Sequence, residues 1–197
     1  MLMSVPRLWQ PCIGDANVNE RALKMKDRSN RNEPLAYHIT FNCYGQHLHG
    51  DEDCSVDRKH NVYGNEYFPT HPGIENFERE AMKQPPYFLD EPRRKVVLKT
   101  IQEVCEFRGW DLIAAHVRST HVHAVVDAKE KPEKVMKDFK SYSSRRLTEA
   151  GFDDKDRKRW ARHGSTTYKW TPDDLYTAVD YVVRGQGDPL MEYYEKE

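Results

Sequence analysis

Two histidines separated by a single residue, His121 and His123, give the clearest indication of chemistry in this sequence. They lie in a strand-like run from Ala115 to Asp127. Because side chains alternate across a strand, both imidazoles project from one face, and the opposite face turns toward a core with Val122, Ala124 and Val126. Two imidazoles roughly 6–7 Å apart at their backbones can bind one divalent ion. The pair therefore predicts a metal site, which needs further ligands and a substrate.

A tyrosine near the end of the chain can supply a nucleophile. The sequence holds 11 tyrosines, and helix geometry selects among them. In the expected last helix, the apolar stripe that faces the core consists of Leu175, Ala178, Val179, Val182 and Val183. Tyr181 lies about 130° from the centre of this stripe, so we expect it at the surface. Tyr176, at the edge of the stripe, and Tyr142, on the preceding helix, are expected to be packed.

The surroundings of Tyr181 suit an attack on a phosphate. A phenol is a poor nucleophile, and it needs a cation near its oxygen or a phosphate polarised by a metal ion. Arg184 and Gln186 follow Tyr181 closely, and the histidine pair could hold the ion. The segment therefore predicts both a nucleophile and a ligand.

Composition excludes several classes of protein. The chain has 197 residues, 32% of them charged, and a mean hydropathy of -0.92. No apolar run approaches the roughly 18 residues of a membrane helix, and residues 1–32 hold no apolar stretch typical of a secretory signal. Because no framework spacing links the four cysteines, we expect reduced thiols in a cytoplasm for Cys12, Cys43, Cys54 and Cys105.

The pattern along the chain predicts one domain of strands and helices. We expect a polar extension over residues 1–34, a strand over 35–44, and an insertion over 45–90 that is a functional loop or partly disordered. The elements expected after it are a helix over 92–108, a strand over 110–117, the histidine strand, a helix over 132–150, a strand over 165–170 and a last helix from Thr171 to about Gly185.

This order, strand–helix–strand–strand–helix–strand, is the split βαβ or ferredoxin-like pattern. We therefore predict an α+β fold with an antiparallel sheet, a long loop insertion after the first strand and a C-terminal helix that carries the tyrosine. The domain is expected to span residues 35–187, and residues 188–197 are expected to form a tail.

Other histidines are interpreted as structural. His116 lies in the neighbouring strand, and pairing of Val117 with His121 across the turn would send it to the opposite face. Zinc binding by a loop cluster is not favoured, because no standard spacing fits Cys43, His47, His49 and Cys54.

Basic clusters suggest contact with nucleic acid, although the net charge is -1. A basic patch on a neutral protein can bind phosphates. The alternative is that these basic side chains are only exposed to water and bind nothing. The cluster over 157–163 favours phosphate binding. Trp160 and Trp170 could stack on unpaired bases or lie in the core. The contacts we predict are those of Arg145, Arg146, Arg157, Arg159, Arg162 and Trp160.

Over roughly residues 35–187 the chain resembles a known superfamily. The segment 121–123 and the small apolar run after it resemble the His-hydrophobic-His motif of the HUH endonucleases. The segment 181–186, YVVRGQ, resembles the tyrosine helix of the single-tyrosine transposases. These are the small insertion-sequence transposases and the REP-associated tyrosine transposases. The segments 37–40 and 140–142 are also similar to that family.

The resemblance implies a mechanism, a cofactor and partners. In this family two histidines and a third polar residue, often a glutamine one turn after the tyrosine, hold Mg²⁺ or Mn²⁺. The tyrosine attacks single-stranded DNA, forming a 5′-phosphotyrosine link and leaving a 3′-OH. Carried over, Tyr181 is the nucleophile, and the ligands are His121, His123 and Gln186. The implied protein is a nucleoid-associated DNA transposase or nickase that acts on hairpin-flanked ends, with no membrane partner. Members of the family are often dimers, which leaves both a monomer and a homodimer open for this chain.

The chain departs from the family pattern at two points. Gln186 follows Tyr181 by five residues, with Gly185 between them, so the helix is expected to end before the glutamine. The insertion over 45–90 is also longer than in compact members, which suits it to DNA contacts or to a lid.

The sequence favours two other functions less. A domesticated, non-catalytic nucleic-acid-binding relative would keep the fold, but the joint presence of His121, His123 and Tyr181 favours the enzyme. A histidine-triad nucleotide hydrolase needs a third alternating histidine, and the chain has Val125 at that position.

Overall fold

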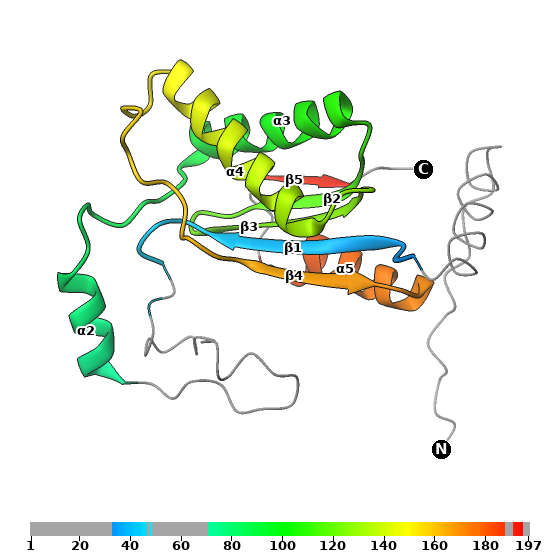
Figure 1. Ribbon diagram of the computed structural model, residues 1–197, viewed down its shortest axis with the longest axis horizontal. Helices are drawn as coiled ribbons and strands as arrows, with labels where there is room; N and C mark the ends of the chain where they lie inside the picture. Colours follow the sequence, from blue (N-terminus) through cyan, green and yellow to red (C-terminus); the bar gives the residue numbers. More distant parts are fainter. Residues whose placement is uncertain (1–32, 47, 49–70, 188–190, 195–197) are drawn as a thin grey trace.

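The computed structural model describes residues 33–46, 48, 71–187 and 191–194, and it contains one five-stranded antiparallel sheet (Figure 1). The strands lie in the order β4-β1-β3-β2-β5. Their bounds are Ala36–Asn42 for β1, Asp111–Val117 for β2, His121–Asp127 for β3, Ser165–Lys169 for β4 and Glu192–Tyr194 for β5.

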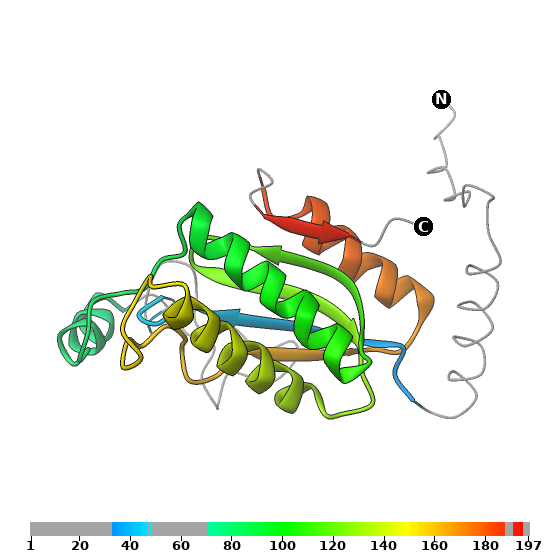
Figure 2. The ribbon, with the colours of Figure 1, turned by 90° about the horizontal axis from the view of Figure 1, so that it is seen from above.

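Helices cover both faces of this sheet. Two long helices, α3 (Glu91–Arg108) and α4 (Pro132–Glu149), lie side by side over one face, and α5 (Pro172–Arg184) lies over the other (Figures 1 and 2). A short helix, α2 (Pro72–Glu80), stands apart from the sheet (Figure 1). The order β1-α3-β2-β3-α4-β4, with β1 and β3 central, confirms the predicted ferredoxin-like α+β fold, and α5 follows it.

Strand β3 divides its side chains between two cores. Val122, Ala124 and Val126 point into the larger core under α3 and α4. Val125 points the other way, into a smaller core with Leu35, Ala36, Ile113, Ala114, Leu175, Ala178 and Val182. Because of this alternation, His121 and His123 share the α5 face, as expected from the sequence.

Local capping sets the ends of the helices that flank the site. The Asp90 side chain accepts from the backbone N–H of Arg93 at the start of α3, and Gly109 ends that helix in the left-handed region with φ 67°. Helix α5 begins with a capping box, in which Thr171 and Asp174 each bind the other's backbone N–H. These bounds agree with the predicted ones to within a residue or two.

Two elements were not predicted. Helix α2 lies inside the expected loop insertion over 45–90, and strand β5 lies inside the expected tail over 188–197. Strand β5 pairs with β2, so this part of the tail covers a sheet edge. The expectation for Tyr176 was also wrong, because that side chain is 54% exposed. Tyr142 is partly buried against the larger core.

The described residues also bear on the cysteines and on membranes. Cys43 and Cys105 are buried thiols without a disulfide. Cys12, Cys54 and the histidines at 47 and 49 lie outside the described residues, as does nearly all of the predicted extension over 1–34. Among the described helices, none has the length and apolar character needed to span a membrane.

Candidate active site

Strands β1 and β3 bring four polar side chains together beneath α5. Thr40 is the direct partner of His123 in the antiparallel register, and His38 lies two residues before Thr40 on the same face. The Nδ1 atom of His123 is 2.9 Å from Thr40 Oγ1 and 3.2 Å from His38 Nε2. With only 5% of its surface exposed, His123 forms the floor of the site.

His121 lies closer to solvent on the same strand face. Its Nδ1 atom is 3.0 Å from the hydroxyl oxygen of Thr120, and its Nε2 atom is 3.4 Å from the amide oxygen of Gln186. The rings of His121 and His123 lie 4.9 Å apart between centroids, nearly perpendicular to each other. Gln186 therefore reaches the histidine pair from the end of α5.

Tyr181 lies over this floor. Its ring centroid is 5.5 Å from that of His123 and 5.9 Å from that of His38, in edge-to-face arrangements. The side chain is 48% exposed, which confirms the prediction that α5 displays it at the surface. The chain thus brings its own tyrosine beside its own histidines.

Gln186 follows the end of α5. The helix ends at Arg184 as expected, and Gly185 adopts a right-handed turn with φ -80° and ψ -1°. The Gln186 amide nitrogen donates to the carbonyl oxygen of Tyr181 at 3.4 Å, which turns the amide oxygen toward His121. The extra residue therefore does not keep Gln186 away from the site.

Burial keeps the deeper imidazoles uncharged. Desolvation lowers the pKa of His123 to about 3, assisted by the neighbouring histidines and opposed by a hydrogen bond with Gln186. Burial, with a smaller contribution from the charge of Lys169, lowers the pKa of His38 to about 4. Both side chains are neutral near pH 7, which is the form that binds metal ions.

His116 does not lie where the sequence placed it. The strands pair Val117 with Val122 rather than with His121, so His116 lies directly opposite His123 on the α5 face. The interpretation of His116 as a structural residue agrees with its fully buried ring, whose Nδ1 atom is 3.0 Å from the carbonyl oxygen of Val182. This contact joins β2 to α5 one residue beyond Tyr181.

The donor atoms fit a small divalent ion. Among the described residues, no group of three or more His, Cys, Asp or Glu side chains could hold a metal. The set here is two imidazoles, which are common ligands of divalent transition-metal ions, and an amide oxygen, a type of ligand that suits Mg²⁺ and Mn²⁺. Two ligands each about 2.1 Å from one ion lie roughly 3.0–3.4 Å apart, and His121 Nε2 and Gln186 Oε1 are 3.4 Å apart. Oxygen atoms from water or substrate would have to complete such a site.

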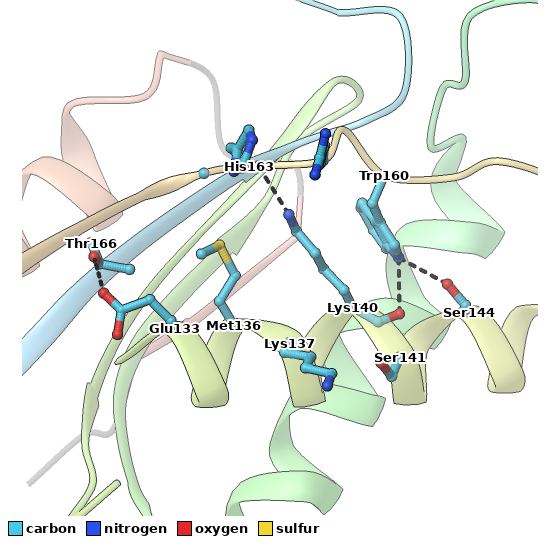
Figure 3. Close-up of a pocket in the computed structure, with 11 residues that line it drawn as sticks. Glu133, Met136, Lys137, Lys140, Ser141, Ser144, Trp160, His163 and Thr166 are labelled. Carbon is cyan, nitrogen blue, oxygen red and sulfur yellow. Dashed lines mark hydrogen bonds between the residues drawn. The ribbon is translucent and has the colours of Figure 1, made fainter. Parts of the chain in front are cut away.

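A separate hollow of about 600 Å³ lies on the other face of the sheet, between α4 and the segment before β4 (Figure 3). Arg162 and Lys137 at its rim are exposed. The Lys140 ammonium group crosses the hollow and donates to the carbonyl oxygen of His163 (Figure 3). It also donates to the carbonyl oxygen of Ala161. Trp160 lines the wall, where its indole N–H donates to the Lys140 carbonyl oxygen and to the Ser144 hydroxyl.

The predicted DNA-contact residues have different environments. Arg145 is exposed and lies over the Tyr142 ring, and Arg146 is paired with Glu103 and Glu149. Arg157 donates to the side chain of Gln84 and to the carbonyl oxygens of Pro85 and Pro86. Only some of these guanidinium groups are therefore open to a phosphate.

Arg159 is buried, which argues against the predicted contact with DNA. It is 3% exposed, and its guanidinium group donates to Asp153, to Thr148 and to backbone carbonyl oxygens. Burial would raise the pKa of Asp153, but hydrogen bonds from Tyr87 and Arg93 hold it below its usual range. Arg159 therefore belongs to an interior ion-pair cluster, a role that its sequence neighbours gave no means of predicting.

His38 and Thr40 lie in the segment 37–40 that resembles the family, but no role in the site was predicted for them. Their alternation along β1 places both on one face, but only the register between β1 and β3 shows that this face also carries His121 and His123. That register depends on residues about 80 positions apart in the chain, and local patterns do not specify it.

Comparisons with known proteins agree with the resemblance seen in the sequence. Residues 82–171 match the family model described as "Transposase IS200 like". The match includes α3, β2, β3 and α4, and thus the histidine pair, whereas Tyr181 and Gln186 lie beyond it. It confirms the predicted resemblance to the single-tyrosine transposases and supports a DNA transposase.

One solved structure among those that match is described as a REP-associated tyrosine transposase bound to a REP hairpin. It is 10% identical, the alignment covers 76% of this chain and 65% of that one, and the TM-score is 0.43. The chain spans less than two thirds of that structure's length. No curated protein matches the chain.

Proposed function

We propose that this chain is a metal-dependent DNA transposase that cleaves and rejoins single-stranded DNA through a 5′-phosphotyrosine intermediate on Tyr181. The observation that carries the proposal is the position of Tyr181, exposed and 5.5 Å from the ring of His123, beside a Gln186 amide that faces His121. A solvent-accessible nucleophile above a set of uncharged donors suits attack on a bound phosphodiester.

The reaction needs only one bond exchange. The phenol oxygen of Tyr181 attacks the phosphorus, a new P–O bond forms to the tyrosine, and the bond to the 3′ oxygen of the preceding nucleotide breaks. The phenol gives up its proton, and the departing 3′ oxygen takes one up as a hydroxyl. Strand transfer is the reverse step, in which a 3′-OH attacks the phosphotyrosine and releases the phenol.

The chain's own residues orient the reactants. His121, His123 and Gln186 would hold a Mg²⁺ or Mn²⁺ ion, and such an ion would polarise the phosphate and neutralise its developing charge. The contact of His116 with the backbone of α5 and the apolar packing of Val182 fix the height of the helix above the sheet. Together they limit the freedom of the tyrosine before the DNA binds.

The partners follow from the same proposal. The substrate is single-stranded DNA, with hairpin-flanked ends, and the exposed Arg145 and Arg162 are proposed to contact its backbone. A homodimer and a nucleoid-associated, cytoplasmic location are part of the proposal. Light scattering tests the homodimer, and imaging of a tagged protein tests the location.

A covalent-capture experiment tests the nucleophile. The protein is incubated with labelled single-stranded oligonucleotides and Mn²⁺, and the adduct is resolved on a denaturing gel. Tyr181→Phe should abolish the adduct and retain DNA binding, because the change removes a single oxygen atom. Tyr176→Phe is the matched control on the same helix, since Tyr176 is also exposed. A full-strength adduct from Tyr181→Phe would refute the assignment.

The role of the ion is tested separately. His121→Ala should remove a ligand and weaken Mn²⁺ binding, which calorimetry measures without DNA. The same variant should lose cleavage. Unchanged Mn²⁺-dependent nicking by His121→Ala would exclude a metal role for the pair. A protein that binds DNA but never forms an adduct would favour the non-catalytic relative.

A further inference from the structure

We propose that Thr40 and His38 are positioning residues: Thr40 accepts a hydrogen bond from His123 Nδ1–H and donates onward to His38 Nε2, and this chain turns the Nε2 lone pair of His123 toward the site. The proposal deepens the proposed function, because it concerns how one of the expected ligands is held. It assigns a role to two side chains of β1, a strand that lies outside the matched residues 82–171.

The contacts are made by opposed strands and not by a loop. Thr40 is the register partner of His123, and the two side chains meet at 2.9 Å. His38 Nε2 approaches the same Nδ1 atom at 3.2 Å and lies 3.5 Å from Thr40 Oγ1. Thr40 Oγ1, His38 Nε2 and His123 Nδ1 thus form one small polar cluster beneath the tyrosine.

These distances allow two directions of hydrogen bonding. In one, His123 Nδ1–H donates to Thr40, and the Thr40 hydroxyl donates onward to His38. In the other, the direction is reversed and His123 carries its proton on Nε2. Only the first leaves Nε2 with a lone pair for an ion, because a neutral imidazole has one donor and one acceptor nitrogen. Ion binding therefore selects the first direction.

The second histidine of the motif has a similar arrangement. His121 Nδ1 is 3.0 Å from the Thr120 hydroxyl oxygen, while its Nε2 faces Gln186. Each histidine of the pair thus has a threonine hydroxyl at Nδ1. Partners of this kind fix the tautomer and ring orientation of metal-binding histidines, and their loss typically weakens metal affinity about 10–100-fold.

His38 has a second contact that a simple acceptor would not need. The centroid of its ring lies 5.4 Å from the ring centroid of His123 and 5.9 Å from that of Tyr181. His38 therefore packs against both the expected ligand and the expected nucleophile. His38 therefore supports the floor of the site as well as ending the hydrogen-bond chain.

The test uses metal affinity and a spectroscopic signature, both measured without DNA. Mn²⁺ affinity is measured by calorimetry, and the protonated nitrogen of His123 is identified by ¹⁵N NMR with Zn²⁺ as a diamagnetic probe. We expect Thr40→Val, which removes only the hydroxyl, to weaken Mn²⁺ binding at least tenfold and to disturb the Nδ1–H signal. Thr40→Ser should restore both, and His38→Phe should weaken binding while keeping a ring in place.

The control is Thr100→Val, the same change at a buried threonine of α3 whose hydroxyl donates to the Val96 carbonyl oxygen. It should leave Mn²⁺ affinity and the His123 spectrum unaltered. Unaltered Mn²⁺ affinity in Thr40→Val, or no rescue by Thr40→Ser, would overturn the inference. So would a Zn²⁺-loaded wild-type protein with His123 protonated on Nε2, a result that needs no variant to fold.

Failure of this inference is distinct from failure of the proposed function. All the measurements can be made in a Tyr181→Phe background, in which no DNA chemistry occurs. A protein with the expected His123 tautomer and Mn²⁺ affinity that never captures DNA would refute only the enzyme. A protein that captures DNA through Tyr181 but tolerates Thr40→Val would refute only the positioning role.

Discussion

Two basic side chains on opposite faces of the sheet show what burial does to charge. His123 has lost access to water, and burial lowers its pKa to about 3, which leaves a neutral imidazole. Lys140 is less enclosed, and burial lowers its pKa only to about 8. Its ammonium group remains largely charged near pH 7 and donates to two backbone carbonyl oxygens. The same physical effect thus yields an uncharged donor set on one face and a structural cation on the other.

Lys140 gives a pH dependence whose sign can be worked out. Its pKa is about 8 in the folded protein, while an exposed lysine titrates near 10.4. Between these values the unfolded chain binds more protons, so the contribution of Lys140 to stability rises with pH. We expect the stability difference between wild type and Lys140→Met to shift in favour of wild type from about pH 8 to pH 10.

Urea unfolding at several pH values measures this difference. Lys137→Met is the matched control, because Lys137 is exposed on the same helix and should give no such change. A wild-type minus Lys140→Met difference that is flat across the window, or that falls with pH, would contradict the assignment.

Helix α5 carries the tyrosine, and just after its C-terminal end the backbone of Gly185 packs closely against Tyr181. A Cβ atom placed on Gly185 would lie 2.8 Å from the carbonyl oxygen of Tyr181 and 2.9 Å from Cδ2 of its ring. Gly185 has an ordinary right-handed backbone, so a side chain there meets a steric obstacle and not a conformational one. The glycine therefore permits the turn that carries Gln186 back beneath the helix.

We expect Gly185→Ala to displace the Tyr181 ring and slow formation of the DNA adduct by at least tenfold, since small misplacements of reacting groups can cost about 10²-fold. Single-turnover capture of an oligonucleotide measures the rate, and thermal unfolding measures stability. Stability should fall by only about 1–3 kcal/mol, the usual cost of overpacking.

The control for this prediction is Gly73→Ala in α2, where the added Cβ meets only the side chain of His71. It should leave adduct formation intact. An unchanged rate in Gly185→Ala would contradict the prediction, because it would show that the turn after α5 accepts a methyl group without displacing Tyr181.

The elements differ in how well the sequence specifies them. Helices α3 and α5 were predicted within two residues because their caps, Asp90 with Gly109 and the Thr171 box, lie in the local sequence. The exposure of Tyr181 followed from helical geometry. Helix α2 has only nine residues and buries none of them, so no packing against the core distinguished its segment from the surrounding loop.

Register and long-range pairing could not be predicted. The place of His116 depends on whether Val117 meets His121 or Val122, a shift of one residue that reverses the face. The roles of His38 and Thr40 depend on strand β1 lying beside β3, and the burial of Arg159 depends on Asp153 and Thr148 folding around it. Each of these facts arises from packing between distant segments.

On the scale of the whole molecule, the sheet separates two kinds of surface. The α5 face carries the tyrosine and the histidines, and the α4 side carries the hollow with Lys137 and Arg162 at its rim. The net charge of -1 hides this distribution. Because exposed cations that contact phosphates release counterions, the arginines of this side make predictions about salt dependence.

We expect Arg162→Ala and Arg159→Ala to act in different ways, although they lie three residues apart. Arg162 is exposed, so its loss should weaken DNA binding at every sequence and reduce the slope of log K against log salt by about 1. Arg159 is buried against Asp153, so its loss should lower stability by about 3 kcal/mol, the usual cost of breaking a buried pair, with an unchanged slope. Fluorescence anisotropy at several salt concentrations gives the slopes, and Lys99→Ala on the exposed side of α3 serves as the control. If Lys99→Ala reduces the salt slope as much as Arg162→Ala does, DNA binding depends on the total charge of the protein and not on this surface. A reduction found only with Arg162→Ala would place a phosphate beside the hollow.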